Sequence, residues 1–238
     1  MIYYLVPLFN EEANIPKLHA SFMEERAKYP IYFVFVDDCS TDGTVDLVRK
    51  IFGTEECTVL TKEQNVGPGH SFNMGFEWIL ERCDPTDSIV TLEGDGTSDL
   101  SILPTMLDLS IKHEYDLVLA SVYAQGGGFE KTSFFRVLIS FVANLTMRSI
   151  FGIKVLTLSS FYRIYRAEIL AKIKAEKGHV VAEPGFICML EALLNCIQQS
   201  ASVIEVPMTL KSEERIGKSK MKVFKTSMDY LKFLLSRK

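Results

Sequence analysis

The chain has 238 residues, of which 47% are hydrophobic and 24% charged, and this composition excludes disordered and collagen-like proteins. We expect one large domain at this length. The five cysteines show no paired spacing and no Cys-x-x-Cys motif, which excludes a disulfide framework and a cysteine zinc site and indicates a reducing compartment. The net charge of −4 argues against a general nucleic-acid-binding protein, so we expect no nucleic-acid partner.

Apolar runs recur at a steady interval through the first half and predict strands. They are residues 2–6, 31–36, 57–60, 88–92 and 116–120. Amphipathic helical patterns separate the first four runs, at residues 15–22, 45–51 and 72–80. Strands that alternate with such helices form βαβ units, so the predicted fold class is α/β with a mainly parallel sheet. The strands are apolar throughout, which predicts that helices cover both faces of the sheet.

The second half of the chain follows a different pattern. Residues 124–129 contain three successive glycines and predict a mobile loop. Helical patterns follow at 167–177, 186–197 and 220–235, with a late strand at 203–206. The last helix places Phe224, Met228, Leu231 and Leu235 on one face.

The ends of the chain and its most apolar region bear on membrane contact. The start lacks a basic leader and a cleavage site, so we expect no signal peptide. Residues 134–158 are apolar, but Arg136, Arg148 and Lys154 interrupt them before they reach the roughly 18 residues of a spanning helix. Residues 211–238 carry nine Lys and Arg against three acids, whereas the first 210 residues carry 17 against 27. This basic end predicts an anionic partner, either phosphate groups or a membrane surface, with a solvated helix as the alternative.

Acidic side chains follow several of the predicted strands. The polar segments at the strand ends are residues 9–11, 37–40, 62–65 and 93–96. The carboxyl ends of parallel strands share one edge of an open sheet, where ligands bind. We therefore expect these carboxylates to line a single ligand-binding edge.

Glu93-Gly94-Asp95 follows the fourth predicted strand. Two carboxylates one residue apart can share a hard cation such as Mg²⁺ or Mn²⁺, with phosphates of a substrate completing the coordination. The alternative is that these acids only complement the dipole of the helix that follows. The sequence thus allows a metal site here but does not require one.

Two further segments end strands and begin helices. Residues 37–44 contain the adjacent acids Asp37 and Asp38, which helix capping does not explain and which can accept hydrogen bonds from a base or a ribose. Residues 65–73 form a glycine-rich turn whose backbone amides can approach a diphosphate. His70 in this turn is expected to be a surface residue rather than a catalyst.

In this order along the chain, four segments resemble the inverting family 2 glycosyltransferases. They are residues 6–15 (VPLFNEEANI), 36–44 (VDDCSTDGT), 65–69 (NVGPG) and 93–95 (EGD). The resemblance covers residues 1 to about 225. It implies a GT-A fold and a nucleotide-diphosphate sugar donor, such as GDP-mannose or a UDP-hexose. It also implies a catalytic domain over residues 1–210, followed by a phosphate-contacting basic loop and an amphipathic helix over 211–238.

Later segments are similar to dolichyl-phosphate mannosyltransferases and related polyprenyl-phosphate glycosyltransferases. They are residues 160–170 (SFYRIYRAEIL), 205–207 (EVP) and 215–220 (RIGKSK). The resemblance implies a polyprenyl phosphate acceptor and direct displacement with inversion, assisted by Mg²⁺ or Mn²⁺.

The resemblance also implies roles for individual residues. Nucleoside contacts would come from Pro7, Phe9, Glu11, Asp37 and Asp38, and further substrate contacts from Gly67 and Arg163. Arg136 is not part of the branch's pattern, and we expect it to replace one arginine that the branch carries and this sequence lacks. Glu93 and Asp95 would hold the metal and the diphosphate, while Arg215, Ser219 and Lys220 would contact phosphates. We expect Asp95, Arg215 and Lys220 to be catalytic.

Departures from the branch leave the acceptor open. Residues 121–123 (SVY) and 140–144 (SFVAN) lack arginines that the branch carries, and Glu93 replaces an Asp. A glycan or other hydroxyl acceptor is therefore an alternative, with Asp99 or Glu191 as the base, and so is an inactive nucleotide-sugar-binding relative. With a lipid acceptor, we expect a cytoplasmic protein that reaches the cytoplasmic face of a membrane. Residues 134–151 and 220–238 are the segments for contact with the membrane or a membrane-protein partner.

Overall fold

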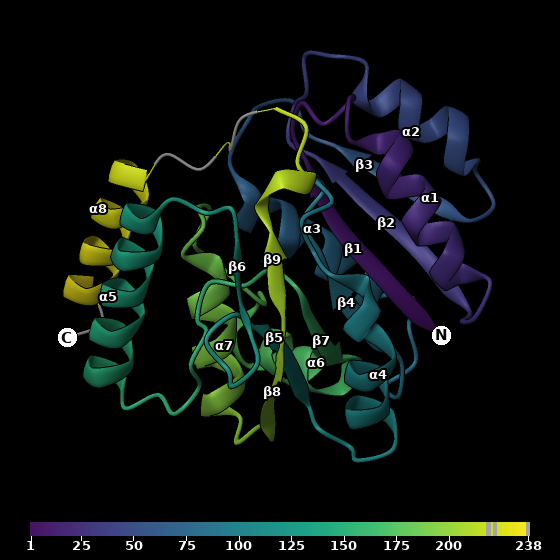
Figure 1. Cartoon of the computed structure of the whole chain (residues 1–238). Helices are drawn as coiled ribbons and strands as arrows, with labels where there is room; N and C mark the ends of the chain where they lie inside the picture. The colour runs from purple at the N-terminus through teal and green to yellow at the C-terminus, as the bar shows by residue number, and fades with distance from the viewer. Residues whose placement is uncertain (218–219, 221–222, 237–238) are drawn as a thin grey trace.

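The computed structural model describes residues 1–217, 220 and 223–236 and shows a twisted sheet with helices on both faces (Figure 1). Seven strands form the main sheet: β1 (Ile2–Leu8), β2 (Ile31–Asp37), β3 (Cys57–Thr61), β4 (Ser88–Thr91), β5 (Leu117–Ser121), β7 (Arg163–Arg166) and β8 (Val203–Pro207). The helices are α1 (Ile15–Arg26), α2 (Thr44–Phe52), α3 (Pro68–Leu80), α4 (Leu103–Ile111), α5 (Phe134–Phe151), α6 (Ala167–Lys177), α7 (Cys188–Gln198) and α8 (Val223–Ser236), with 3-10 turns at Leu100–Ile102 and Ser212–Glu214. The predicted α/β class is confirmed.

The strand order of the main sheet is β3-β2-β1-β4-β7-β5-β8. All neighbouring strands run parallel except β7, which is antiparallel to both β4 and β5. From β1 to β3 the chain adds strands on one side of β1, and it then returns to add β4 on the other side. The direction of winding therefore reverses between β1 and β4. This is the switch point at which open α/β sheets bind ligands.

Each face of the sheet carries its own apolar core. One core packs side chains of α3, α6 and α7 against the sheet, and the other packs α1, α2 and α4. Val34 and Val36 of β2 point into the first core, while Phe33 and Phe35 point into the second. The strands are apolar at successive positions because both of their faces are covered, as predicted.

A small second sheet joins two segments that the sequence did not indicate as strands. Here β6 (Gly128–Glu130) pairs in parallel with β9 (Thr209–Lys211). The glycine run predicted as a mobile loop leads into this sheet, and Gly127 donates a backbone hydrogen bond to Ala124 O at 2.8 Å. A Cβ at Gly127 would lie 2.4 Å from Ser121 O, so close packing requires glycine here.

Helices α5 and α8 lie side by side at one end of the molecule, away from α1 and α2 (Figure 1). Phe151 of α5 contacts Phe233 of α8, with ring centroids 6.2 Å apart. Phe233 is buried, whereas Met228 and Leu235, two members of the predicted apolar face of α8, are exposed. None of the described helices is long and apolar enough to span a bilayer.

Candidate active site

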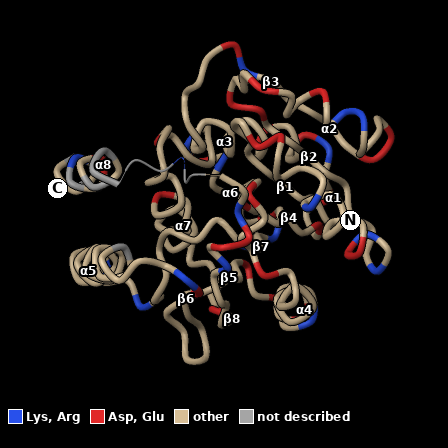
Figure 2. The backbone as a smooth tube through the Cα atoms, turned by 45° about the horizontal axis from the view of Figure 1, so that its top comes forward, with Lys and Arg blue, Asp and Glu red and all other residues tan. Residues whose placement is uncertain are grey.

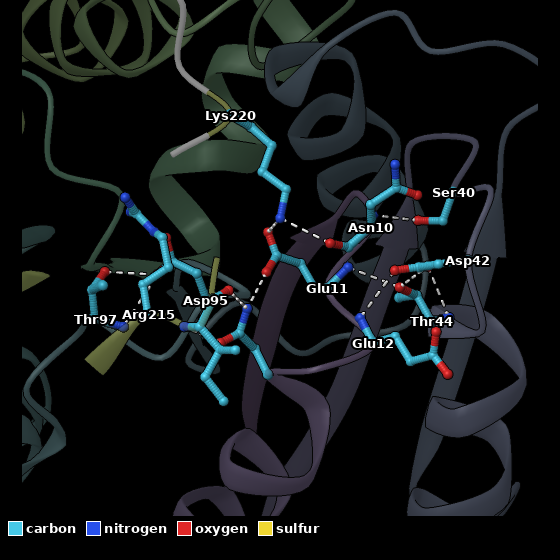
Figure 3. Close-up of polar contacts among 12 residues, drawn as sticks. Asn10, Glu11, Glu12, Ser40, Asp42, Thr44, Asp95, Thr97, Arg215 and Lys220 are labelled. Carbon is cyan, nitrogen blue, oxygen red and sulfur yellow. Dashed lines mark hydrogen bonds and ion pairs between the residues drawn. The ribbon is translucent and has the colours of Figure 1, made fainter. Parts of the chain in front are cut away.

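The loops that follow β1 and β2 are locked together at the carboxyl edge of the sheet. Asn10 N donates to Ser40 Oγ at 2.8 Å, and Thr41 N donates back to Asn10 Oδ1 at 2.7 Å. Glu11 N donates to Thr44 Oγ1 at 2.8 Å, which fixes the backbone of Glu11 (Figure 3). Pro7 and Phe9 are partly exposed on the same edge. The predicted nucleoside-contacting segments are therefore neighbours.

Asp37 and Asp38 are both buried, and each is bound by the protein itself. Asp37 accepts hydrogen bonds from Ser40 N at 2.9 Å and from Ser40 Oγ at 2.5 Å. These contacts satisfy both carboxylate oxygens of Asp37, one each, and hold the turn after β2.

Asp38 instead holds the glycine-rich turn. Its two oxygens accept from Val66 N and Gly67 N, both at 2.8 Å. Lys62 Nζ lies 2.6 Å from Asp38 Oδ1, and both side chains are nearly inaccessible. Gly67 has a φ of 111°, and a Cβ there would meet Pro184 O at 2.5 Å. The pair of Asp38 and Lys62 thus fixes a turn that only glycine can make at this point.

Asp95 lies on the same edge and carries a cationic partner. Its Oδ1 accepts from Thr97 N at 3.1 Å and Thr97 Oγ1 at 2.7 Å. Its Oδ2 accepts from Arg215 Nε at 2.5 Å, and Arg215 Nη2 makes a second, shorter contact with the same atom (Figure 3). Beside this pair, Lys220 Nζ lies 2.8 Å from Glu11 Oε1. Two carboxylates of the edge are therefore neutralised by two cations of the basic C-terminal segment.

The segment that carries Arg215 crosses the edge as a strap, which we define as residues 211–217. Ile216 N donates to Asn14 Oδ1 at 2.8 Å, and Asn14 Nδ2 donates back to Ile216 O at 3.1 Å. Lys211 pairs with Asp99 at 3.3 Å, and Lys17 pairs with Glu214. The strap is therefore attached mainly by polar contacts to α1 and to the loop before α4.

Burial and neighbouring acids shape the protonation of this edge. Burial raises the pKa of Glu11, and the nearby Asp95 carboxylate adds to that effect, while Lys220 and Asn14 oppose it. Burial also raises the pKa of Glu93, again with a contribution from Asp95, while Ser98 opposes it. The carboxylates thus repel one another, and a bound cation relieves that repulsion.

Glu93 and Asp95 have different partners. Glu93 Oε2 accepts a short hydrogen bond from Ser98 Oγ, and Glu93 lines a cavity of 420 Å³ between α1 and the loop before α4. Asp99 and Glu25 line the same cavity. Asp95, by contrast, faces the strap. Glu93 and Asp95, which are two residues apart in the sequence, therefore face different surroundings: Glu93 faces the cavity, and Asp95 faces the strap.

The chemistry of Asp95 fits a hard divalent cation. A carboxylate that is held by Thr97 and that already binds a guanidinium is placed to bind positive charge. Among the described residues, no group of three or more His, Cys, Asp or Glu side chains forms a metal cage. A cation here would therefore take one or two protein carboxylates and obtain its other ligands from a diphosphate, which is the usual arrangement for Mg²⁺.

The structure corrects the expectation for Arg163. This side chain has no exposed surface, and its guanidinium donates to Ser160 O, Met189 O and Leu158 O at 2.7–2.8 Å. It also donates to the Tyr165 hydroxyl. Arg163 therefore joins β7 to its surroundings, and a side chain without exposed surface is not placed to contact a substrate.

The remaining predicted residues are one that the structure places elsewhere, two that the structure does not describe at the side-chain level, and His70. Glu191, a candidate base, is buried and accepts from Ala182 N and Glu183 N at 2.9 and 2.8 Å, so it anchors a turn. Arg136 lies on α5, but its side chain is outside the description, and Ser219 lies outside the described residues. His70 is exposed, as expected.

Sequence reasoning missed two residues of this edge. Asn14 links Glu11 to the strap, and Lys62 is the buried partner of Asp38. Asn14 lies in the motif at residues 6–15, and Lys62 lies in the polar segment at residues 62–65. Both segments were predicted to contribute to the ligand-binding edge. The residue types Asn and Lys did not by themselves indicate that Asn14 and Lys62 bind other side chains rather than water.

Comparison with known proteins finds relatives of similar sequence. The chain is 28% identical over 219 residues to polyprenol monophosphomannose synthase of Mycolicibacterium smegmatis, covering 91% of this chain and 79% of the relative. It is 27% identical to undecaprenyl-phosphate mannosyltransferase of Micrococcus luteus, covering 91% and 86%.

The fold matches that of glucosyl-3-phosphoglycerate synthase from Mycobacterium tuberculosis, solved with Mn²⁺ and UDP-glucose. The TM-score is 0.72 at 17% identity, and the match covers 100% of this chain and 78% of the other. This likeness shows the GT-A fold. Residues 4–174 match the family described as glycosyl transferase family 2. The chain therefore belongs to glycosyl transferase family 2.

Proposed function

We propose that this protein transfers a sugar from a nucleotide-diphosphate sugar to a polyprenyl monophosphate, with inversion at the anomeric carbon. The observation that carries the proposal is the paired edge, in which Asp95 and Glu11 hold Arg215 and Lys220 at the switch point of a GT-A sheet. This edge therefore offers carboxylates to a bound metal cation and cationic side chains to a diphosphate.

In this proposal the nucleoside lies over Pro7, Phe9 and the turn of Asp37. Asp38 acts indirectly, because both of its oxygens hold the Gly67 turn. Asp95 and Glu93 would hold Mg²⁺ or Mn²⁺, which would supply positive charge to the leaving diphosphate. Arg215 and Lys220 would exchange their carboxylate partners for phosphate oxygens and stabilise the charge that develops there.

The choice of a lipid phosphate acceptor rests on the relatives and on chemistry. Two relatives that align over 91% of the chain are named for transfer to polyprenyl carriers. A phosphate monoester has a second pKa of ~6, so it is already an anionic nucleophile at neutral pH and needs no strong base. With Glu191 anchoring a turn, the edge offers few free carboxylates for that task.

A hydroxyl acceptor is the second candidate, and one feature favours it. Glu93 has a raised pKa and lines the 420 Å³ cavity together with Asp99. A carboxylate with a raised pKa is suited to remove a proton from a hydroxyl. A soluble acceptor in this cavity would then lie beside the donor.

A donor and acceptor panel tests the proposal. Purified protein with Mn²⁺ or Mg²⁺ is given GDP-mannose, UDP-glucose or UDP-N-acetylglucosamine, with a detergent-soluble short-chain polyprenyl phosphate or with soluble glycans. We expect transfer to the lipid phosphate that chelation abolishes. Transfer to soluble glycans alone would overturn the lipid acceptor, and nucleotide binding without turnover would indicate an inactive relative.

A further inference from the structure

Glu25 is a buried carboxylate on the core-facing side of α1. The buried residues of this helix recur at the spacing of an amphipathic stripe and are Ile15, Leu18, Phe22 and Glu25. Three of the four are apolar, so an acid at the fourth position is costly unless it binds a partner. Glu25 is only 6% exposed, and an apolar residue would suit the packing of α1 better. The acid at this position therefore calls for a partner.

Two buried tyrosines accompany Glu25, and a polar atom of each of the three side chains lacks a partner. Glu25 Oε2, the Tyr4 hydroxyl and the Tyr162 hydroxyl make no hydrogen bond with the described residues. Neither tyrosine has exposed surface. Burial raises the pKa of both phenols and the Glu25 carboxylate adds to this effect, so the three groups lie near one another. Buried polar atoms normally have partners, so three without one in the same place indicate a bound group that the chain does not supply.

Glu25 also lines the 420 Å³ cavity between α1 and the loop before α4. Acidic and basic positions lie close together around α1 and α4 (Figure 2). In the cavity the carboxylates outnumber the ammonium groups by two, the charged lining residues being Glu24, Glu25, Glu93, Asp99 and Glu214 with Lys17, Lys28 and Lys211. The cavity therefore attracts positive charge.

The carboxylates of the cavity stand at both of its ends. At the end crossed by the strap, Glu214 pairs with Lys17, and Asp99 lies beside them in the cavity wall. At the other end, Glu25 Oε1 lies 3.0 Å from Lys28 Nζ, whose side chain is 56% exposed and easily displaced. Positions 17 and 25 of α1 are separated by about 12 Å at 1.5 Å per residue. The cavity is therefore elongated, with acids about that far apart.

The groups around Glu25 favour an ammonium ion as the ligand. An ammonium donates to a carboxylate and to neutral hydroxyl oxygens, and aromatic rings attract it as well. Tyr4 and Phe22 supply such rings beside Glu25, with centroids 5.1 Å apart in an edge-to-face contact. A neutral polyol would donate hydrogen bonds too, but it would leave the excess negative charge of the cavity unbalanced.

We propose that this cavity binds a linear organic cation with an ammonium group at each end, one held by Glu25 and the other by the carboxylates beside the strap. The site is separate from the predicted nucleoside contacts Pro7, Phe9 and Asp37, none of which lines the cavity. The proposal goes beyond the proposed function, because neither the sugar donor nor the acceptor takes part in this binding.

Calorimetric titration of spermidine into the full chain, in about 150 mM NaCl without nucleotide or metal, tests the proposal. Spermidine carries its terminal ammonium groups on a chain whose length is comparable to the cavity. We expect wild type to bind it and Glu25→Gln to bind it at least about tenfold more weakly, because a charge-assisted hydrogen bond is lost. The matched control is Glu56→Gln, which removes an acid that pairs with Arg26 of α1 but does not line the cavity, and it should bind as wild type does.

A second variant and a second ligand complete the test. Glu24→Gln changes an exposed acid of the cavity and should bind spermidine about threefold more weakly, so it replaces Glu25→Gln if that variant does not fold. Putrescine, a shorter diamine, should bind wild type about tenfold more weakly than spermidine, because it cannot reach both ends.

The outcomes against the proposal are equally definite. If wild type does not bind spermidine, or binds it no better than folded Glu25→Gln does, the proposal is wrong and ordered water is the partner of the buried oxygens. Equal affinity for putrescine and spermidine contradicts binding at two ends. No step of the test requires turnover, so its result is independent of the donor and acceptor panel.

Discussion

The edge formed by β1, β2 and β4 and the end formed by α5 and α8 are built in opposite ways. At the edge, acids such as Asp37 and Asp38 are buried, and the protein itself supplies their hydrogen-bond partners. At the α5 end, eight large apolar side chains face solvent. The edge binds its buried acids with groups of the protein itself, whereas the α5 end exposes a surface that the described residues do not cover.

This difference separates two tasks of a transferase. The sugar donor is a defined small molecule, and a preorganised edge suits it. Protein side chains that are held in place before binding lose little conformational entropy when the donor binds. A polyprenyl phosphate acceptor, in contrast, is a lipid, and an apolar surface next to that edge suits it. The strap contacts the edge through Arg215 at Asp95, and it contacts the segment just before α5 through Ser212 at Thr132.

The largest expected effect lies at the preorganised edge. Asp38→Ala removes the partner of the buried Lys62 and of two backbone amides, so it leaves a charge unpaired in the interior. We expect the free energy of unfolding to fall by about 3–5 kcal/mol. Urea unfolding followed by circular dichroism measures this.

The double variant D38N/K62M provides the control for that change, because it removes the buried charge together with its partner. It should recover much of the lost stability, since a buried pair replaced as a unit is often nearly neutral. A single Asp38→Ala variant as stable as wild type would show that the edge is not held in the way described.

A smaller effect is expected at Glu93, where burial raises the pKa. A raised pKa in the folded state means that ionised Glu93 destabilises the fold, and this penalty appears as the pH rises through the ordinary carboxyl range. Glu93→Gln should therefore raise Tm by a few degrees at neutral pH, and the gain should vanish at low pH where Glu93 is protonated. Calorimetry at both pH values checks it, and a gain that is independent of pH would contradict the assignment.

The smallest effect is expected in the strap. Lys211→Gln removes a partly exposed ion pair with Asp99, which contributes at most about 1 kcal/mol. Because the change loosens the strap without touching Asp95, Mn²⁺ should bind the nucleotide-free protein about twofold more tightly. Titration of free Mn²⁺ by electron paramagnetic resonance measures this. Lys112→Gln removes a comparable pair with Asp108 on α4 and should leave the Mn²⁺ affinity unchanged.

Much of the fold could be predicted because the apolar periodicity is strong. The strands β1 to β5 and β8 stand near their expected positions, and the acids after them do meet at one edge. Strand β7 was missed because Arg163-Ile164-Tyr165-Arg166 is short and begins and ends with arginine, a residue usually found at the surface. Only the structure shows three carbonyl oxygens converging on the Arg163 guanidinium.

The remaining misses concern contacts between distant segments. Strands β6 and β9 have three residues each, and their pairing depends on packing around Gly127 rather than on propensity. In α8 the sequence pattern placed Met228 and Leu235 on one apolar face without showing what that face meets; the structure exposes both and buries Phe233, which contacts Phe151 of α5. A hydrophobic pattern indicates which residues share a face and does not show which face meets the neighbouring helix.

We propose that Asp95 binds the metal through which the edge holds a nucleoside diphosphate. Calorimetric titration of GDP and UDP into wild type and Asp95→Asn, with and without Mn²⁺, tests it most directly. We expect Mn²⁺ to strengthen nucleotide binding to wild type by at least about tenfold, and we expect Asp95→Asn to keep its fold but lose this enhancement. The same Mn²⁺ enhancement in both proteins would contradict it.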